Sequence, residues 1–119
     1  MKAYTDIEQS KKLTDILPTE SADMHYIRHS LENFYSPTPI IGKYSKIQNE
    51  IPCWSTNSLL DILKAKCNRF EISSRVNNKW NIFATKFDFT YNNWCDGGCE
   101  NLIDGCVEII VKLKESKLL

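Results

Sequence analysis

The stretch Ile51-Pro52-Cys53-Trp54-Ser55 runs directly into Thr56-Asn57-Ser58-Leu59-Leu60-Asp61-Ile62-Leu63 and specifies the start of a helix. Ser55 is a good N-cap, because its hydroxyl accepts a hydrogen bond from a first-turn amide that has no partner inside the helix. Trp54, just before the cap, and Leu59, one turn inside it, have the spacing of a hydrophobic staple. The helix then continues through an apolar stripe at helical spacing: Leu59, Leu60, Ile62, Leu63 and Cys67.

The composition predicts one globular domain over residues 1–119. Of the 119 residues, 42% are hydrophobic and 25% are charged, which is typical of a domain that buries roughly two-thirds of its unfolded surface. No apolar run reaches the about 18 residues of a membrane span, and residues 1–6 lack the apolar core of a signal peptide. We therefore expect a soluble cytoplasmic protein with no membrane partner. In such a protein the five cysteines are expected to be reduced thiols.

Apolar periodicity predicts three helices and a sheet. The first helix spans residues 6–17, with Thr5 or Asp6 as its N-cap and Pro18 at its end. The last helix begins after Asn101 and has a wide apolar face, which implies deep burial. Strands are predicted over residues 23–29, 38–44, 69–76 and 80–87. The expected fold is a two-layer α+β domain, in which about three helices pack on one face of a mainly antiparallel sheet.

The last two predicted strands form a hairpin around Asn77-Asn78-Lys79. A three-residue loop pairs Val76 with Trp80 and puts the apolar residues of both strands on one face, whereas a two-residue loop divides them between the faces. Burial therefore favours the three-residue loop. The apolar face then contains Phe70, Ile72, Val76, Trp80, Ile82 and Ala84.

The opposite face of this hairpin is the candidate binding surface. It is expected to carry Phe83 and Phe87 among the arginines Arg69 and Arg75. Aromatic residues interleaved with arginines on a sheet occur in proteins that stack the bases of single-stranded nucleic acid and hold its phosphates. Exposed aromatic residues on a small sheet more often mark a subunit contact, a covering helix or a bulge that turns them inward. The net charge of zero gives nucleic-acid binding little support, because nucleic-acid-binding domains are usually basic.

Two histidines and two cysteines form a candidate metal site. The chain contains His25-x3-His29 and Cys95-x3-Cys99, and two His with two Cys satisfy tetrahedral zinc. On a strand, however, His25 and His29 lie about 13 Å apart, and the Cys-x3-Cys spacing is not typical of zinc sites. The pattern favours ordinary thiols and strand histidines, so we expect no metal and no other cofactor.

Catalytic residues are indicated no more strongly. Cys95 and Cys99 are candidate nucleophiles. His25 and His29 are candidate bases, but any chain with five Cys and two His offers such pairs. Cys53 lies at a helix N-terminus, where a thiol can be reactive, yet a small buried residue is the favoured interpretation. The sequence thus favours a non-enzymatic protein.

Several blocks of sequence follow one another in a characteristic order: Tyr4-Thr5-Asp6 with Gln9-Ser10-Lys11-Lys12-Leu13, Ile16-Leu17-Pro18, Glu20-Ser21-Ala22-Asp23-Met24, Ile51-Pro52-Cys53-Trp54-Ser55 and Asp104-Gly105-Cys106-Val107-Glu108-Ile109-Ile110. In these blocks the chain resembles a family of short uncharacterised proteins of gut Bacteroides-type bacteria, which are often encoded by prophages or mobile elements. Where the family more commonly has Ala, this chain has Gly105. The resemblance implies no known activity, cofactor or ligand.

The sequence therefore favours a small non-enzymatic interaction protein of phage or mobile-element origin, which binds a second copy of itself as a homo-oligomer or binds another protein. The first alternative is a protein that binds single-stranded nucleic acid through the Arg/Phe face of the 69–87 hairpin. The second alternative is a zinc or thiol enzyme that uses Cys95 and Cys99.

Overall fold

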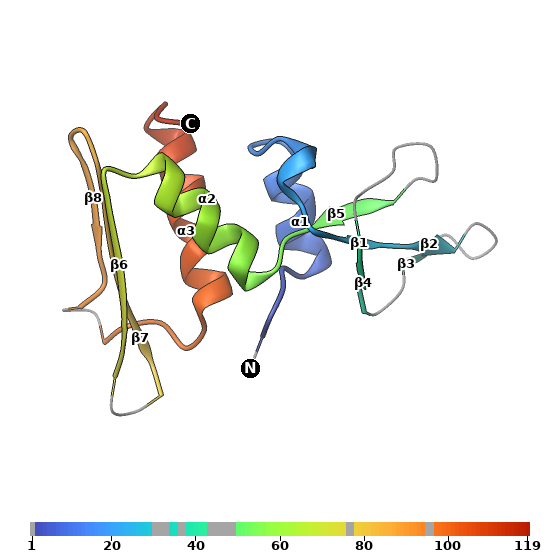
Figure 1. The fold of residues 1–119 in the computed structure, drawn as a ribbon, viewed down its shortest axis with the longest axis horizontal. Coiled ribbons are helices and arrows are strands. Elements are labelled where there is room, and N and C mark those ends of the chain that lie inside the picture. Colours follow the sequence, from blue (N-terminus) through green and yellow to red (C-terminus); the bar gives the residue numbers. More distant parts are fainter. Residues whose placement is uncertain (1, 30–33, 36–37, 43–49, 76–77, 95–96) are drawn as a thin grey trace. The chain divides into compact units, whose positions relative to one another are not determined.

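The computed structural model describes residues 2–29, 34–35, 38–42, 50–75, 78–94 and 97–119, and over these residues the protein is α+β (Figure 1). Every described strand pair is antiparallel. None of the described helices has the length and apolar character that a membrane span needs. The chain divides into two compact units, residues 3–58 and residues 59–119 together with 1–2. The predicted α+β class is confirmed, while a single domain over residues 1–119 stays a prediction.

The first unit begins with α1 (Ile7–Thr14), and Asp6 is its N-cap. The Asp6 carboxylate accepts a hydrogen bond from the Gln9 amide at 2.7 Å, and the Gln9 side chain accepts one from the Asp6 amide at 3.1 Å. These two bonds complete a capping box. The helix stops short of the predicted end at Pro18, because Thr14 and Asp15 are weak helix formers and the chain continues there in turns.

The sheet of the first unit has the strand order β4-β1-β5. Its strands are β1 (Met24–Tyr26), β4 (Ile40–Ile41) and β5 (Ile51–Cys53). The predicted strand over 23–29 is interrupted at Ile27, so that β2 (Arg28–His29) pairs separately with β3 (Phe34–Tyr35). The predicted strand over 38–44 yields β4, and its residues 43–44 lie outside the described chain. Pro52 is compatible with β5 because β5 is an edge strand, which can lack a ladder donor.

The core of the first unit surrounds Tyr26 and Cys53, which are buried together with Ile51. Two buried hydroxyls are satisfied within it, since Thr5 Oγ1 lies 2.8 Å from Ser10 Oγ. The Tyr26 hydroxyl donates to the Thr5 carbonyl oxygen at 2.7 Å. The capping hydroxyl at the start of the next helix is also confirmed, because Ser55 Oγ accepts from the Ser58 amide at 3.2 Å.

The boundary between the units falls inside α2 (Thr56–Lys66), after Ser58. Of the predicted apolar stripe, Leu59 and Leu63 are fully buried. The other stripe residues, Leu60, Ile62 and Cys67, are half-buried.

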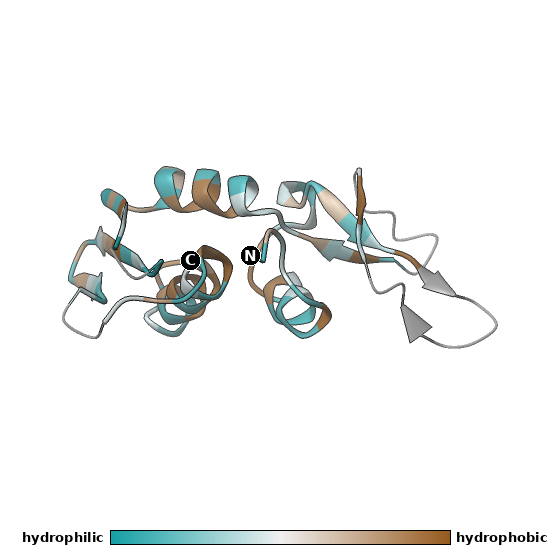
Figure 2. Ribbon diagram, turned by 90° about the horizontal axis from the view of Figure 1, so that it is seen from below, coloured by the Kyte–Doolittle hydropathy of each residue, from teal (hydrophilic) through white to brown (hydrophobic). Residues whose placement is uncertain are grey.

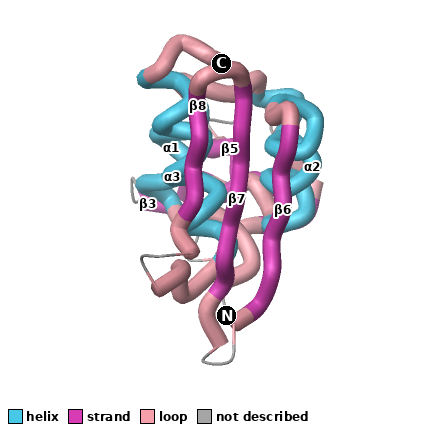
Figure 3. Tube along the Cα trace, turned by 90° about the vertical axis from the view of Figure 1, so that its left-hand side faces the viewer, coloured by secondary structure: helices cyan, strands magenta, loops and turns pink. Residues whose placement is uncertain are grey.

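The second unit contains the sheet β6-β7-β8, with β7 in the centre (Figure 3). Its strands are β6 (Arg69–Ser74), β7 (Trp80–Lys86) and β8 (Phe89–Asn92). Ile82 and Ala84 of β7 are fully buried. They point to the same side as Ile72 and Phe70, with which they pair directly. The predicted division of the hairpin into an apolar and an opposite face is therefore correct for the described strand residues.

The predicted register of this hairpin is wrong by two residues. Trp80 pairs with Ser74 and not with Val76, and the Arg75 amide donates to the Lys79 carbonyl oxygen at 2.7 Å. Asn78 has a positive φ of 61°, which Asn tolerates better than most residues and which suits the last position of a short loop. Because the shift is two residues, each side chain keeps its face. Val76 and Asn77 lie outside the described residues.

The predicted second strand of the hairpin also ends earlier than expected. Phe87 has a positive φ of 53° and lies in the turn that leads into β8, 77% exposed. Its amide donates to the Asn68 side-chain oxygen at 2.9 Å. The expectation that Phe87 shares a face with Phe83 is therefore wrong. β8 itself was not predicted.

The last helix, α3 (Leu102–Glu115), begins as predicted, because Asn101 Oδ1 accepts from the Asp104 amide at 2.8 Å. In Figure 2 the helices carry both hydrophobic and hydrophilic residues, as amphipathic helices do. α3 contacts β7 through Gly105, which lies against the Ile82 side chain. Its buried apolar residues are Leu102, Ile103, Cys106, Val107, Ile109, Ile110 and Leu113.

Candidate functional site

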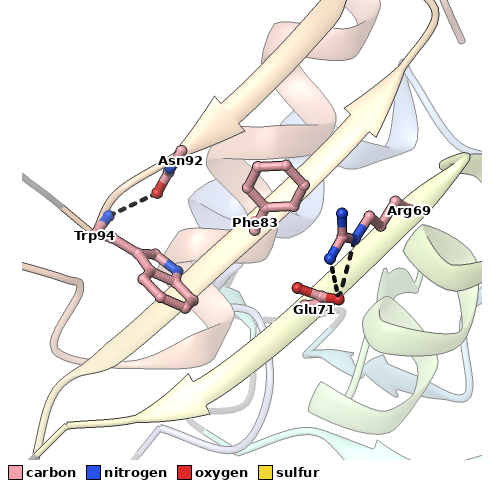
Figure 4. Close-up of a pocket in the computed structure, with 5 residues that line it drawn as sticks. All are labelled: Arg69, Glu71, Phe83, Asn92 and Trp94. Carbon is pink, nitrogen blue, oxygen red and sulfur yellow. Dashed lines mark hydrogen bonds and ion pairs between the residues drawn. The ribbon is translucent and has the colours of Figure 1, made fainter.

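The side of the β6–β8 sheet opposite the buried residues of β7 carries a hollow of about 250 Å³. We call this the outer-face hollow. The Phe83 ring on the central strand lies between an Arg69–Glu71 pair on β6 and the Trp94 ring beyond β8 (Figure 4). The hollow is lined by Arg69, Glu71, Phe83, Asn92 and Trp94.

Strand alternation explains why these side chains meet. Glu71 pairs directly with Phe83, and Phe83 pairs directly with Asn92, so the three side chains point to one face. Arg69 follows two positions before Glu71 on the same strand and therefore shares that face. Trp94 reaches the hollow from the segment after β8, where its amide donates to the Asn92 side-chain oxygen at 3.0 Å.

The Arg69 guanidinium contacts both the Glu71 carboxylate and the Phe83 ring. Its Nε and Nη2 donate to Glu71 Oε1 at 3.0 and 2.9 Å. Its guanidinium carbon lies 5.3 Å from the centre of the Phe83 ring, within the range of a cation–π contact. Because both charged side chains are largely exposed, the pair contributes little to folding stability. Its main effect is to place two opposite charges, which balance each other, beside the Phe83 ring in the lining of the hollow.

Arg75 bonds to Asn81, which shares the face of Phe83, but it lies outside the hollow. Its Nη1 donates to the carbonyl oxygen of Trp94 at 3.1 Å and to Asn81 Oδ1 at 3.3 Å. Arg75 therefore ties the segment that carries Trp94 to the hairpin and does not line the hollow. Of the four predicted surface residues, the structure brings Arg69 and Phe83 together and places Arg75 against the backbone of Trp94. Phe87 lies apart in its turn.

Sequence reasoning missed Glu71, Asn92 and Trp94. Glu71 was detectable, because it alternates with Arg69 along the predicted strand. Asn92 and Trp94 depend on β8, which was not predicted, so no sequence signal placed them on this face. Trp94 is the largest apolar side chain at the hollow, and it is 49% exposed.

A second hollow, of about 350 Å³, is lined mainly by polar groups of β8 and α3. The Tyr91 hydroxyl donates to Glu108 Oε2 at 3.0 Å, and Lys112 Nζ lies 3.2 Å from Glu108 Oε1. Lys112 Nζ also lies 5.3 Å from the centre of the Tyr91 ring. These three side chains satisfy one another, so the cluster is explained by structure alone.

The candidate metal ligands give no site in the described chain. Cys95 and the side chain of His29 lie outside the described residues. His25 Nδ1 lies 2.9 Å from the Gly42 carbonyl oxygen, and its Nε2 lies 3.8 Å from Glu50 Oε1. Among the described residues no three His, Cys, Asp or Glu side chains are placed to hold an ion.

The described thiols are not poised as nucleophiles. Cys53, Cys67, Cys99 and Cys106 are free. Burial raises the pKa of the Cys99 thiol, which contacts the Trp80 carbonyl oxygen at 3.6 Å. Burial also raises the pKa of Cys53, which is fully buried. A raised pKa keeps a thiol protonated and unreactive, so the interpretation of Cys53 as a small buried residue is confirmed.

Comparisons of this chain with protein-family models, with curated proteins and with solved structures found no match. The function must therefore be inferred from the surface itself.

Proposed function

We propose that this chain is a non-enzymatic interaction protein that binds an apolar side chain of a protein partner in the outer-face hollow. The observation that supports this most is the position of Phe83 and Trp94 beside the Arg69–Glu71 pair. Aromatic residues and arginine are enriched at the energetic centres of protein–protein interfaces. A paired guanidinium and a side-chain amide at the rim offer hydrogen bonds to the partner without leaving a buried charge unpaired.

The size of the hollow suits this role. Its volume of about 250 Å³ is below the range of about 300 to 1,000 Å³ that is usual for small-molecule sites. It is large enough to receive an apolar side chain. Glu71 is the single carboxylate among the lining residues, and Arg69 already occupies one of its oxygens. The lining therefore offers no pair of groups for acid–base chemistry.

Nucleic-acid binding through this face is a weaker proposal. Arg69, the one cation of the lining, is paired with Glu71 at 2.9 Å, and the carboxylate would repel a phosphate. The chain as a whole has no excess of positive charge, although such an excess is typical of proteins that hold a phosphate backbone.

Other parts of the proposal follow from the sequence. They are the origin in a phage or mobile element, the cytoplasmic location and the self-association as a homo-oligomer. The packing of helices on one face of an antiparallel sheet belongs with them.

The experiment is a selection of peptides from a random linear library displayed on phage particles, followed by titration of the enriched peptides into ¹⁵N-labelled protein. The three tryptophans give three indole N–H resonances, which distinguish the exposed Trp94 from the buried Trp54. We expect the Trp94 indole to shift on binding. Trp94→Ala should weaken binding by about tenfold or more, as loss of a hot-spot aromatic does.

Phe87→Ala is the matched control, since it removes an exposed aromatic of the same unit outside the hollow. It should leave the peptide affinity within about twofold, as expected for an aromatic that does not contact the ligand. Peptides that bind Trp94→Ala as well as the wild type would overturn the proposal. So would salt-dependent binding of single-stranded oligonucleotides that competes with the peptides, and this result would favour the nucleic-acid alternative.

A further inference from the structure

Strand β6 is an open edge of its sheet. Among the strands that the structure describes, the order β6-β7-β8 leaves β6 with one neighbour (Figure 3). Five of its six residues are exposed. Edge strands are usually protected against pairing by Pro, by inward-pointing charge, by bulges or by short length. β6 (Arg69-Phe70-Glu71-Ile72-Ser73-Ser74) contains no Pro or Gly, and its two charged residues point to the outer face.

The direction of the backbone groups follows from the hydrogen bonds of β7. Trp80 exchanges both backbone bonds with Cys99, at 2.8 and 2.9 Å, on the side away from β6. Ile82 likewise bonds toward Asn93, donating to its side-chain oxygen at 2.7 Å. The β7 residues that pair with the even-numbered positions of β6 therefore direct their N–H and C=O groups away from β6. In an antiparallel ladder, the β6 residues opposite them direct their own N–H and C=O groups away from β7. The backbone groups of Phe70, Ile72 and Ser74 thus point out of the open edge.

We propose that β6 pairs antiparallel with β6 of a second copy of this chain, with Ile72 opposite Ile72. This register places Phe70 opposite Ser74 of the second copy and Ser74 opposite its Phe70. It pairs all three outward-directed residues with one another, giving about six backbone hydrogen bonds across the two-fold axis. A register shifted by two residues leaves some of these groups unpaired.

The side chains agree with this register. Ile72 is 36% exposed although it lies on the buried face of the sheet. Opposite its own copy, Ile72 gains an apolar cross-strand partner. On the outer face, Glu71 lies opposite Ser73 of the second copy. Arg69 lies opposite Arg75 of the second copy, and Glu71 accepts from Arg69 at 2.9 Å, so a carboxylate lies beside each pair of arginines.

The pairing has a functional consequence. It joins two three-stranded sheets into one continuous sheet and puts two outer-face hollows on the same side of it. This consequence rests on the proposed function, and two linked sites would raise the affinity for a partner that presents two apolar side chains. The pairing itself depends only on β6.

The first test measures the mass of the protein by light scattering from about 10 µM to about 1 mM, a range suited to a small interface. We expect the mass to rise from 13.8 kDa toward twice that value. Ile72→Lys should keep the chain monomeric, because an inward-pointing charge blocks edge pairing. Ile41→Lys is the matched control, since Ile41 is an exposed isoleucine (84%) on the edge strand β4, and it should leave association unchanged. Near-ultraviolet circular dichroism confirms that both variants fold.

The second test resolves the register by disulfide trapping. Ile72→Cys places two thiols opposite each other, with Cα atoms about 5.5 Å apart in a hydrogen-bonded pair, a separation that a disulfide can span. Ser74→Cys lies on the same strand and face, but its two copies would be about 13 Å apart along the sheet. Under mild oxidation Ile72→Cys should form a covalent dimer, and Ser74→Cys should behave like the wild type, which carries the same native thiols.

A strict monomer at about 1 mM would overturn the proposal, since specific dimers are populated at that concentration. Association that persists in Ile72→Lys, or a covalent dimer of Ser74→Cys alone, would overturn it as well. Failure of the pairing leaves the peptide titrations of the hollow unchanged, and failure of the hollow leaves the measured mass unchanged. The two failures are therefore distinguishable.

Discussion

Gly105 of α3 lies so close to Ile82 of β7 that a methyl group added at its α-carbon would sit 2.5 Å from Ile82 Cδ1. The same methyl group would lie 3.0 Å from Cys99 Sγ. Glycine normally costs a helix about 1 kcal/mol relative to Ala. Here the missing side chain is what allows helix and sheet to approach, because Ile82 fills the space above it.

This contact predicts the effect of Gly105→Ala. The gain in helix propensity is opposed by overpacking, which costs about 1 to 3 kcal/mol in a well-packed core, so we expect a net loss of roughly 1 kcal/mol in the free energy of unfolding. In an Ile82→Val background the Cδ1 atom is gone, and Gly105→Ala should be neutral or stabilising. Urea unfolding of the four proteins measures this coupling. Equal effects of Gly105→Ala in both backgrounds would show that Ile82 is not the obstacle.

The capping box of α1 predicts a second change in stability. Asp6→Ala removes the oxygen that accepts from the Gln9 amide at 2.7 Å, and loss of such a cap costs about 1 kcal/mol. Asp6→Asn keeps an acceptor in the same place and should lose only a few tenths of a kcal/mol. Thermal unfolding of both variants at pH 7 compares them. If Asn and Ala cost the same, the role of Asp6 lies in its charge and not in the cap.

The parts of the fold that could be predicted are those set by local sequence. Asn101 and Ser55 were recognised as caps because one side-chain oxygen and one first-turn amide define each cap. The faces of the hairpin followed from alternation of apolar residues. The register did not, because a shift by two residues preserves every face and leaves burial unchanged.

The strand β8 shows why Asn92 and Trp94 were missed. It follows β7 through a turn in which Phe87 has a φ of 53°, a conformation that sequence patterns assign to Gly or Asn. Without that turn, Phe87 is read as the end of a strand. Asn92 and Trp94 then have no place on the sheet. Arg69 and Phe83 were found because both lie within the predicted hairpin and on the same face.

The free energy of unfolding at alkaline pH should depend on the buried Cys106 thiol of α3. Burial raises the pKa of Cys106 from 9.0 to about 12. The unfolded chain therefore loses this proton first, so the stability that Cys106 contributes is present below pH 9 and is lost as the pH rises from 9.0 to about 12. The loss is about 1.4 kcal/mol per pH unit for one such group.

The measurement is the free energy of unfolding between pH 8 and 11. Cys106→Ala should have a shallower decline than the wild type, whatever its stability at pH 7. Removal of the half-buried thiol in Cys67→Ala is the matched control and should change the slope less. Parallel pH profiles for the wild type and Cys106→Ala would mean that the thiol ionises equally in both states.

Arg75 is predicted to act on the hollow through Trp94. Its bond of 3.1 Å to the Trp94 carbonyl oxygen anchors a residue that is otherwise half-exposed, so Arg75→Ala should let the segment move without removing any lining side chain. The ¹H–¹⁵N heteronuclear NOE of the Trp94 indole should fall in the free protein, and the affinity for selected peptides should fall by about threefold to tenfold, as preorganisation is lost. Lys79→Ala removes a positive charge from the same hairpin without this bond, and both readouts should stay at the wild-type value. A lower affinity with an unchanged NOE would mean that Arg75 contacts the peptide directly.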